Sequence, residues 1–414
     1  MMLSKLRNND VMSWIAIIFI VIASFSGIID FMNLKSFSRT FQLLIVGLYL
    51  ILVWGSNDER QYGTAKLIRR LSGFLLLYLV VRLIIDIFIS HTDSRLIFIC
   101  FSQLFMLYFW IYAGFRSAEE VVDKVLHYCQ LLFWAGILFS VVEFFIPQSI
   151  MTGILLTVFG GVVPDSYFSR DLQYSDSLRL GSFYLSPLTF AFTCLFLLCF
   201  YKVDGFKKSK WIVTALITVL AKTKSSLMGG VLFLAGKYSR VMNFVLLALV
   251  LLAIVILPTV FTGWDFYYNY DGTDFKSTAN HLSGLVFGLR SAFEHPFWGS
   301  GLGTSGYLVY LETLANPGLP GSPFIFEIPY QNGNESTLGV IGYQLGGIFL
   351  MIHLTLFLTM FKYQMENRNY VIATFILLSL LFQILTESSL TLLVSIAQAF
   401  MFCKTSHVET IEDI

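Results

Sequence analysis

Apolar runs of about the length that a lipid bilayer requires recur along the whole chain of 414 residues. A helix needs about 20 residues to cross the hydrocarbon core of a membrane. The sequence is 56% hydrophobic and only 13% charged, whereas about 25% of the residues of a typical soluble domain are charged. These features predict an all-α polytopic membrane protein in which residues 1–414 form a single transmembrane bundle.

The apolar runs define about twelve candidate transmembrane helices. The seventh and eighth are short, and polar residues 222–226 separate them, which suggests helices that stop early around a wet pocket. The candidates lie near residues 12–29, 37–54, 71–90, 96–115, 125–146, 180–201, 211–222, 226–236, 241–261, 337–361, 370–386 and 388–403.

The distribution of Lys and Arg residues predicts the orientation of the bundle. If the N-terminus lies in the cytoplasm, seventeen of the 27 Lys and Arg residues fall on the inner side and nine on the outer side, with Arg82 inside a span. Cytoplasmic loops of membrane proteins are enriched in these residues. We therefore expect both termini to be cytoplasmic.

Several classes of function receive no support. A net charge of +1 without a basic stripe argues against a nucleic-acid partner. The five cysteines fall in or beside apolar runs, where they are expected to act as small hydrophobic residues. The sequence has no phosphate-binding Walker motif, nucleophile elbow or Cys/His metal-ligand spacing, so we predict neither a metal nor another cofactor.

Two outer loops are long, residues 147–179 and residues 262–336. Long loops on a rigid scaffold are frequent carriers of function. The second loop contains "HLSGLVFGLRSAFEHPFWGSGLGTSG", residues 281–306, which predicts a short amphipathic helix that carries Arg290 on a face away from its apolar stripe. The Gly-rich turn that follows is expected to bend closely around a bulky headgroup. The apolar stripe, expected to rest on the bundle, consists of Leu282, Leu285, Val286, Leu289 and Phe293.

Four cations lie at or beside span ends on the outer side: Arg179, Lys222, Lys224 and Arg290. If they converge on one pocket, they suit an anionic lipid headgroup, because Arg in particular can donate two hydrogen bonds to phosphate oxygens. A lipid-linked pyrophosphate is the natural ligand, since a reaction outside the cytoplasm needs a substrate that arrives already activated. The alternative for Arg290 is a solvated loop charge paired with Glu294 at i, i+4.

Three acidic or basic residues have two interpretations each. Glu335 could orient or deprotonate an acceptor hydroxyl, or it could be an acid that the dipole favours at a helix N-terminus. Arg82 and Asp86 are candidates for function because they lie inside a span. Their i, i+4 spacing instead favours a structural ion pair.

Several segments resemble the O-antigen ligase and polymerase superfamily. They are "RLGSFYLSP" at 179–187, "KTKSS" at 222–226, "GLRSAFEHPFWGSGLG" at 288–303 and "NESTLGVIGYQLGG" at 334–347. The spacing of Arg290 and Gly306 is similar to the Arg-x15-Gly pattern of Wzy-type polymerases. Two departures occur: Thr223-Lys224-Ser225-Ser226 lacks the arginine of the superfamily's Thr-x-Ser-Arg, and Glu335 stands where ligases have a histidine. The second departure favours a polymerase.

The resemblance implies a membrane-embedded, GT-C-like, metal-independent glycosyltransferase of the bacterial inner membrane, with loops 147–179 and 262–336 in the periplasm. Its implied reaction joins undecaprenyl-pyrophosphate-linked oligosaccharide repeat units into O-antigen or a related surface polysaccharide, a step of lipopolysaccharide biosynthesis. Arg179 and Arg290, with Lys222 or Lys224, would bind the pyrophosphate, and Glu335 would act on the acceptor. A regulator of chain length is an expected partner beside the membrane lipid.

Two alternatives remain open. One is an O-antigen ligase, which transfers finished glycan to the lipid A core. The other, of a different class, is a flippase for the lipid-linked oligosaccharide, which has the same number of spans. A transporter would be expected to show halves related by internal symmetry. No convincing repeat occurs, and the single long loop late in the chain breaks any such symmetry.

Overall fold

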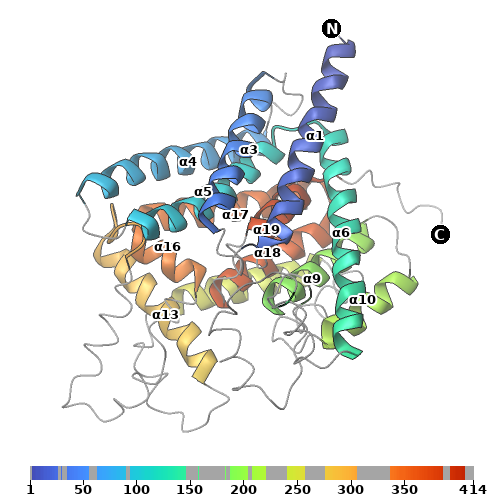
Figure 1. Ribbon diagram of the computed structural model, residues 1–414. Helices are drawn as coiled ribbons and strands as arrows, with labels where there is room; N and C mark the ends of the chain where they lie inside the picture. The colour runs from blue at the N-terminus through green and yellow to red at the C-terminus, as the bar shows by residue number, and fades with distance from the viewer. Residues whose placement is uncertain are drawn as a thin grey trace.

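The computed structural model describes the regular core of the chain. The described residues are 2–26, 29, 35–55, 63–89, 94–145, 157, 182, 187–203, 208–220, 240–256, 276–304, 336–385 and 392–405. Their regular structure is entirely helical, as Figure 1 shows. The first long loop, 147–179, lies outside these residues except for Thr157, and so does the eighth candidate span at 226–236.

The helices follow the apolar runs of the sequence. Four of them are long and apolar enough to cross a membrane: Thr64–Ile89, Leu96–Gly114, Glu119–Val142 and Gly347–Glu366. An all-helical membrane protein is thereby supported. The helices are α1 (Met2–Ser24), α3 (Lys35–Gly55), α4 (Thr64–Ile89), α5 (Ser94–Gly114), α6 (Glu119–Phe145), α9 (Pro187–Val203), α10 (Lys208–Leu220), α13 (Lys276–Glu294), α16 (Thr337–Leu345), α17 (Gly347–Glu366), α18 (Tyr370–Leu385) and α19 (Leu392–Cys403), with a further apolar helix at Arg240–Ile256.

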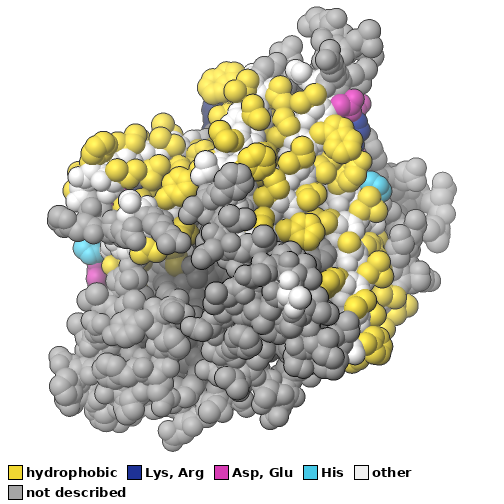
Figure 2. Space-filling model, in the orientation of Figure 1, with side chains coloured by type: hydrophobic (Ala, Val, Ile, Leu, Met, Phe, Trp, Pro, Cys, Tyr) yellow, Lys and Arg dark blue, Asp and Glu magenta, His cyan; other side chains and the backbone are white. Residues whose placement is uncertain are grey.

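Aromatic side chains of α1, α3 and α5 meet in the core. The ring of Trp110 lies edge-on to Phe19 at 4.8 Å and to Tyr49 at 5.1 Å, and all three side chains are fully buried. The outer faces of the same helices expose large apolar residues such as Leu44 and Ile51. Figure 2 shows the resulting hydrophobic surface over this side of the bundle. A lipid environment explains such a surface, because hydrocarbon covers it in place of water.

Polar contacts between helix ends define one end of the bundle. Thr64, at the start of α4, donates to Glu366 at the end of α17 over 2.7 Å. Glu119, at the start of α6, accepts from Thr405, just after α19. The chain then traverses the bundle along α4 and returns along α5, so the last turns of α4 lie at the opposite end.

The tenth candidate span, predicted as one helix over 337–361, is two helices. Gly346 separates α16 from α17 and adopts φ 87°, a left-handed conformation that glycine tolerates without steric cost. Inside an otherwise apolar run, the Gly346-Gly347 pair is a local sign of such a break. The contacts that stabilise it come from a distant segment of the chain, as described next.

Candidate functional site

Helix α13, inside the long loop predicted at 262–336, packs directly on α16. The contact depends on glycine: a methyl group added at Gly288 would lie 2.1 Å from the carbonyl oxygen of Gly339, and one added at Gly342 would lie 2.6 Å from that of Gly288. Figure 1 shows the two helices side by side. The absence of side chains at these positions allows the two backbones to touch.

Substitution of Gly288 with alanine is expected to destabilise the protein by about 1–3 kcal/mol, because the new methyl group would meet backbone atoms that cannot move aside cheaply. Thermal unfolding in detergent measures the change. Gly47→Ala in α3 is the matched control, since a methyl group there meets nothing within 4 Å. That variant should instead gain stability, by roughly 0.5–1 kcal/mol. Equal behaviour of the two variants would contradict the packing.

Arg290 follows Gly288 by two residues, so it lies on the side of α13 away from the contact with α16. Leu285, Val286 and Leu289 are buried, as the predicted stripe requires, and Arg290 is half-buried. The prediction for Phe293 is wrong: its side chain is 77% exposed, while Ala292 is buried in its place. Ala292, and not Phe293, faces α17, because the two backbones are close at this point. A methyl group added at Gly347 would lie 2.5 Å from the Ala292 carbonyl oxygen. The side chain of Leu282 lies outside the described residues.

The turn that follows α13 fills the break between α16 and α17. Helix ends leave backbone N–H and C=O groups without partners inside the helix. Here Ser300 and Gly301 donate backbone N–H groups to the carbonyls of Tyr343 and Gln344, over 2.8 and 3.0 Å. The N–H of Ile348 donates to the carbonyl of Pro296 over 2.8 Å. The turn therefore satisfies groups on both sides of Gly346.

The Gly-rich turn faces the protein itself, which corrects the expectation that it bends around a headgroup. A methyl group at Gly299 would lie 2.6 Å from the backbone of Gln344, and one at Gly303 would lie 2.7 Å from the backbone of Ile97. Gly301 adopts φ 110° and packs against Arg82 and Asp86. The glycines allow close contact with neighbouring helices at these three positions.

Arg82 and Asp86 form the ion pair that their spacing predicts. Arg82 Nε donates to Asp86 Oδ2 over 3.0 Å, and both residues are buried. The same carboxylate oxygen accepts the backbone N–H of Leu302 over 2.7 Å. These buried contacts fit the structural interpretation favoured from the sequence. Beyond that prediction, it also binds the turn to α4.

Tyr78 and Trp298 add a second attachment between α4 and the turn. The Tyr78 hydroxyl contacts the carbonyl oxygens of Phe297 and Leu345, at 2.9 and 3.0 Å. Its ring stacks on Trp298 at 5.6 Å, and the Arg82 guanidinium lies 5.7 Å from the centre of the same indole. Sequence reasoning missed both aromatic residues, because neither carries a charge or belongs to a periodic pattern that marks this role.

A buried polar chain connects the bundle to the start of α16. His353 Nδ1 lies 2.8 Å from the Tyr108 hydroxyl, and its Nε2 lies 2.8 Å from Gln383 Oε1. A neutral imidazole that donates to the amide oxygen and accepts from the phenol satisfies both contacts. The Ser336 hydroxyl lies 3.5 Å from the carbonyl oxygen of Gln383 and caps α16 by accepting the N–H of Gly339. Gln383 therefore contacts both His353 and the N-cap residue of α16.

Among the predicted site residues, only Arg290 belongs to the described part of the chain. Arg179, Lys222, Lys224 and Glu335 lie outside it, so their convergence with Arg290 stays a prediction. Glu335 immediately precedes the N-cap Ser336, and the first turn of α16 contains no acidic residue. Helix α13, which carries Arg290, packs on α16, and Glu335 is the residue before the N-cap of α16 in the chain.

Comparison with known proteins leaves the family open. No protein-family model matches this sequence, and no curated protein matches it.

Proposed function

We propose that this protein is a Wzy-like polymerase of O-antigen or a related surface polysaccharide, a twelve-span, GT-C-like enzyme of the bacterial inner membrane with both termini in the cytoplasm. It transfers a growing glycan from its undecaprenyl pyrophosphate carrier to an incoming lipid-linked repeat unit. The new glycosidic bond forms to an acceptor hydroxyl, whose proton is removed, and the bond to the pyrophosphate breaks. The leaving group is undecaprenyl pyrophosphate, whose terminal phosphate takes the negative charge.

One observation carries the proposal: two of the segments that resemble the superfamily, 288–303 and 334–347, meet in one packed unit. They are separated by about thirty residues in the chain, yet their described parts share the Gly288–Gly339 contact and the hydrogen bonds from Ser300 and Gly301. A site assembled from such segments needs this kind of rigid support, because transition-state stabilisation depends on donors held in position before the reaction.

The proposed roles follow from the chemistry of each side chain. Arg290 and Arg179, with Lys222 or Lys224, stabilise the negative charge that grows on the pyrophosphate as the glycosidic bond breaks. Glu335 orients and deprotonates the acceptor hydroxyl. These roles require no nucleotide, because the substrate brings its own activated bond.

Purified protein in liposomes tests this function. The substrate is the lipid-linked repeat unit extracted from cells that lack the protein, and the products are separated by length. We expect a ladder of longer lipid-linked glycans in the absence of any lipid A core. Transfer only when lipid A core is added would indicate a ligase. Movement of the unchanged substrate across the membrane, without a new glycosidic bond, would indicate a flippase.

A further inference from the structure

A groove runs between α1 and α6 on the outer surface of the bundle. Its first part, of about 470 Å³, is lined by polar and aromatic side chains from both helices. Its second part, of about 280 Å³, is lined almost entirely by aliphatic side chains. Ile17 and Tyr128 line both parts, so the two are continuous. The groove is polar at one end and apolar along the rest, as an amphipathic ligand would require.

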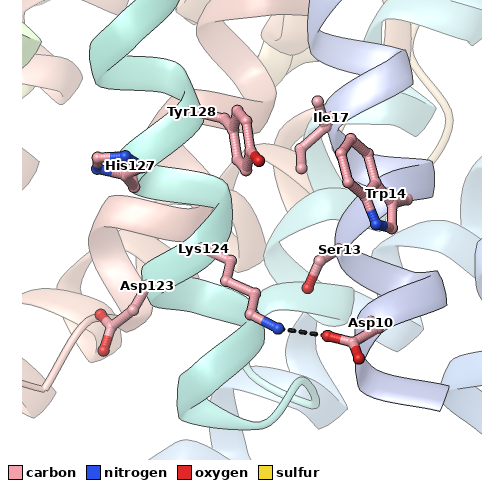
Figure 3. A pocket seen from close by; sticks show the side chains of 8 residues that line it. All are labelled: Asp10, Ser13, Trp14, Ile17, Asp123, Lys124, His127 and Tyr128. Atoms are coloured by element: carbon pink, nitrogen blue, oxygen red, sulfur yellow. Dashed lines mark hydrogen bonds and ion pairs between the residues drawn. The ribbon is translucent and has the colours of Figure 1, made fainter. Parts of the chain in front are cut away.

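The polar end presents both signs of charge. Lys124 extends from α6 toward α1 and forms an ion pair with Asp10, as Figure 3 shows. Both side chains remain about half exposed, at 50% and 57%, so a ligand can reach them. Figure 3 shows Asp123 on the other flank of α6, pointing away from this pair. Its carboxylate lies 3.9 Å from the ammonium of Lys404. The ring of Trp14 lies 5.9 Å from that of Tyr128 beside the pair, a placement typical of aromatic residues at a membrane surface.

The groove as a whole, its polar end included, has about the length of one membrane leaflet. The two helices run parallel here, since Asp10 lies opposite Lys124 and Val21 lines the groove with Leu132. From Asp10 to Val21 a helix rises roughly 16 Å. Half of the hydrocarbon core of a bilayer is about 15 Å thick. A lipid whose headgroup lies at Lys124 would therefore extend along the groove through most of one leaflet.

The polar end of the groove is remote from the proposed glycosyltransferase site. The turn after α13 contacts α4 at Asp86 and α5 at Ile97, near the start of α5. Helix α6 begins directly after the other end of α5, so Lys124 lies at the opposite end of the bundle. A ligand in this groove is accordingly distinct from a substrate bound beside Arg290.

We propose that the groove between α1 and α6 binds one phospholipid with a zwitterionic, primary-ammonium headgroup, of the phosphatidylethanolamine class. The phosphate lies on Lys124, the ammonium lies on the carboxylate of Asp10, and one acyl chain follows the aliphatic lining. An anionic headgroup without an ammonium would place its charge beside this carboxylate. A choline headgroup carries no N–H donor for it.

Native mass spectrometry of the full-length protein in detergent tests the site. The protein is mixed with phosphatidylethanolamine, phosphatidylglycerol or phosphatidylcholine of identical acyl chains. We expect one molecule of phosphatidylethanolamine to be retained in preference to the other two. Lys124→Ala should lower this retention by about tenfold, the loss expected for a charge-assisted hydrogen bond. Ala135→Phe, which fills the apolar part of the groove, should lower it as well.

Lys362→Ala is the matched control. Lys362 forms an exposed i, i+4 pair with Glu366 at the same end of the bundle but does not line the groove. The Lys362→Ala variant should retain as much phosphatidylethanolamine as the unchanged protein. Equal retention of the three lipids, or unchanged retention by Lys124→Ala, would overturn the proposal. An equal loss in Lys362→Ala would also overturn it, by showing that any surface lysine acts in the same way.

Discussion

Arg290→Ala is expected to lower glycan transfer at least about a hundredfold, because removal of one preorganised donor to a developing anion typically costs that much. The measurement is the rate of chain extension on lipid-linked repeat units, with the amount of membrane-inserted protein held equal. Arg290→Lys should retain part of the activity, since lysine keeps the charge but loses the two-pronged contact with phosphate oxygens.

Glu294→Ala separates the two interpretations of Arg290. Glu294 lies one helical turn further along α13 and is exposed. If Arg290 only serves as a solvated partner of this acid, the two alanine variants should be equally mild, because exposed ion pairs contribute little. The proposed role instead requires a large loss for Arg290→Ala and a small one for Glu294→Ala. Full-length polymer from Arg290→Ala would refute the role in pyrophosphate binding.

Asp86→Leu is expected to lower the free energy of unfolding by about 3–5 kcal/mol, because it leaves the Arg82 guanidinium buried without its counter-charge. It also removes the acceptor for the backbone N–H of Leu302. Thermal or denaturant unfolding in detergent measures the loss. Asp86→Asn should cost less, since the amide oxygen can still accept from Leu302.

The double variant Arg82→Met with Asp86→Leu tests the cause of that loss. Removal of both charges eliminates the unpaired buried ion, so the double variant should be more stable than Asp86→Leu alone. If the double variant is the less stable of the two, the contact of Arg82 with Trp298 contributes more stability than the unpaired charge costs. Unchanged stability of Asp86→Leu would contradict the burial of the pair.

Local patterns predicted the elements of this protein better than their assembly. The i, i+4 spacing of Arg82 and Asp86 predicted their ion pair, and the apolar spacing around Leu285 and Leu289 predicted a helix with a buried face. Both predictions depend on residues within two helical turns, where helix geometry alone determines which side chains are neighbours. The break at Gly346 was not predicted, although the Gly346-Gly347 pair marks it, because a glycine pair alone does not show that a helix ends. The contacts that stabilise the break come from Ser300 and Gly301, more than forty residues earlier in the chain.

The sequence by itself determined that this chain is an apolar, all-helical protein suited to a membrane, because the composition and length of its apolar runs leave few other ways to satisfy the backbone. Only the tertiary structure decided what the glycines of the turn do. They bring the turn against α4, α5 and the end of α16, where the motif had suggested space for a headgroup. Close approach of two backbones is a property of pairs of segments, so no single stretch of sequence can reveal it.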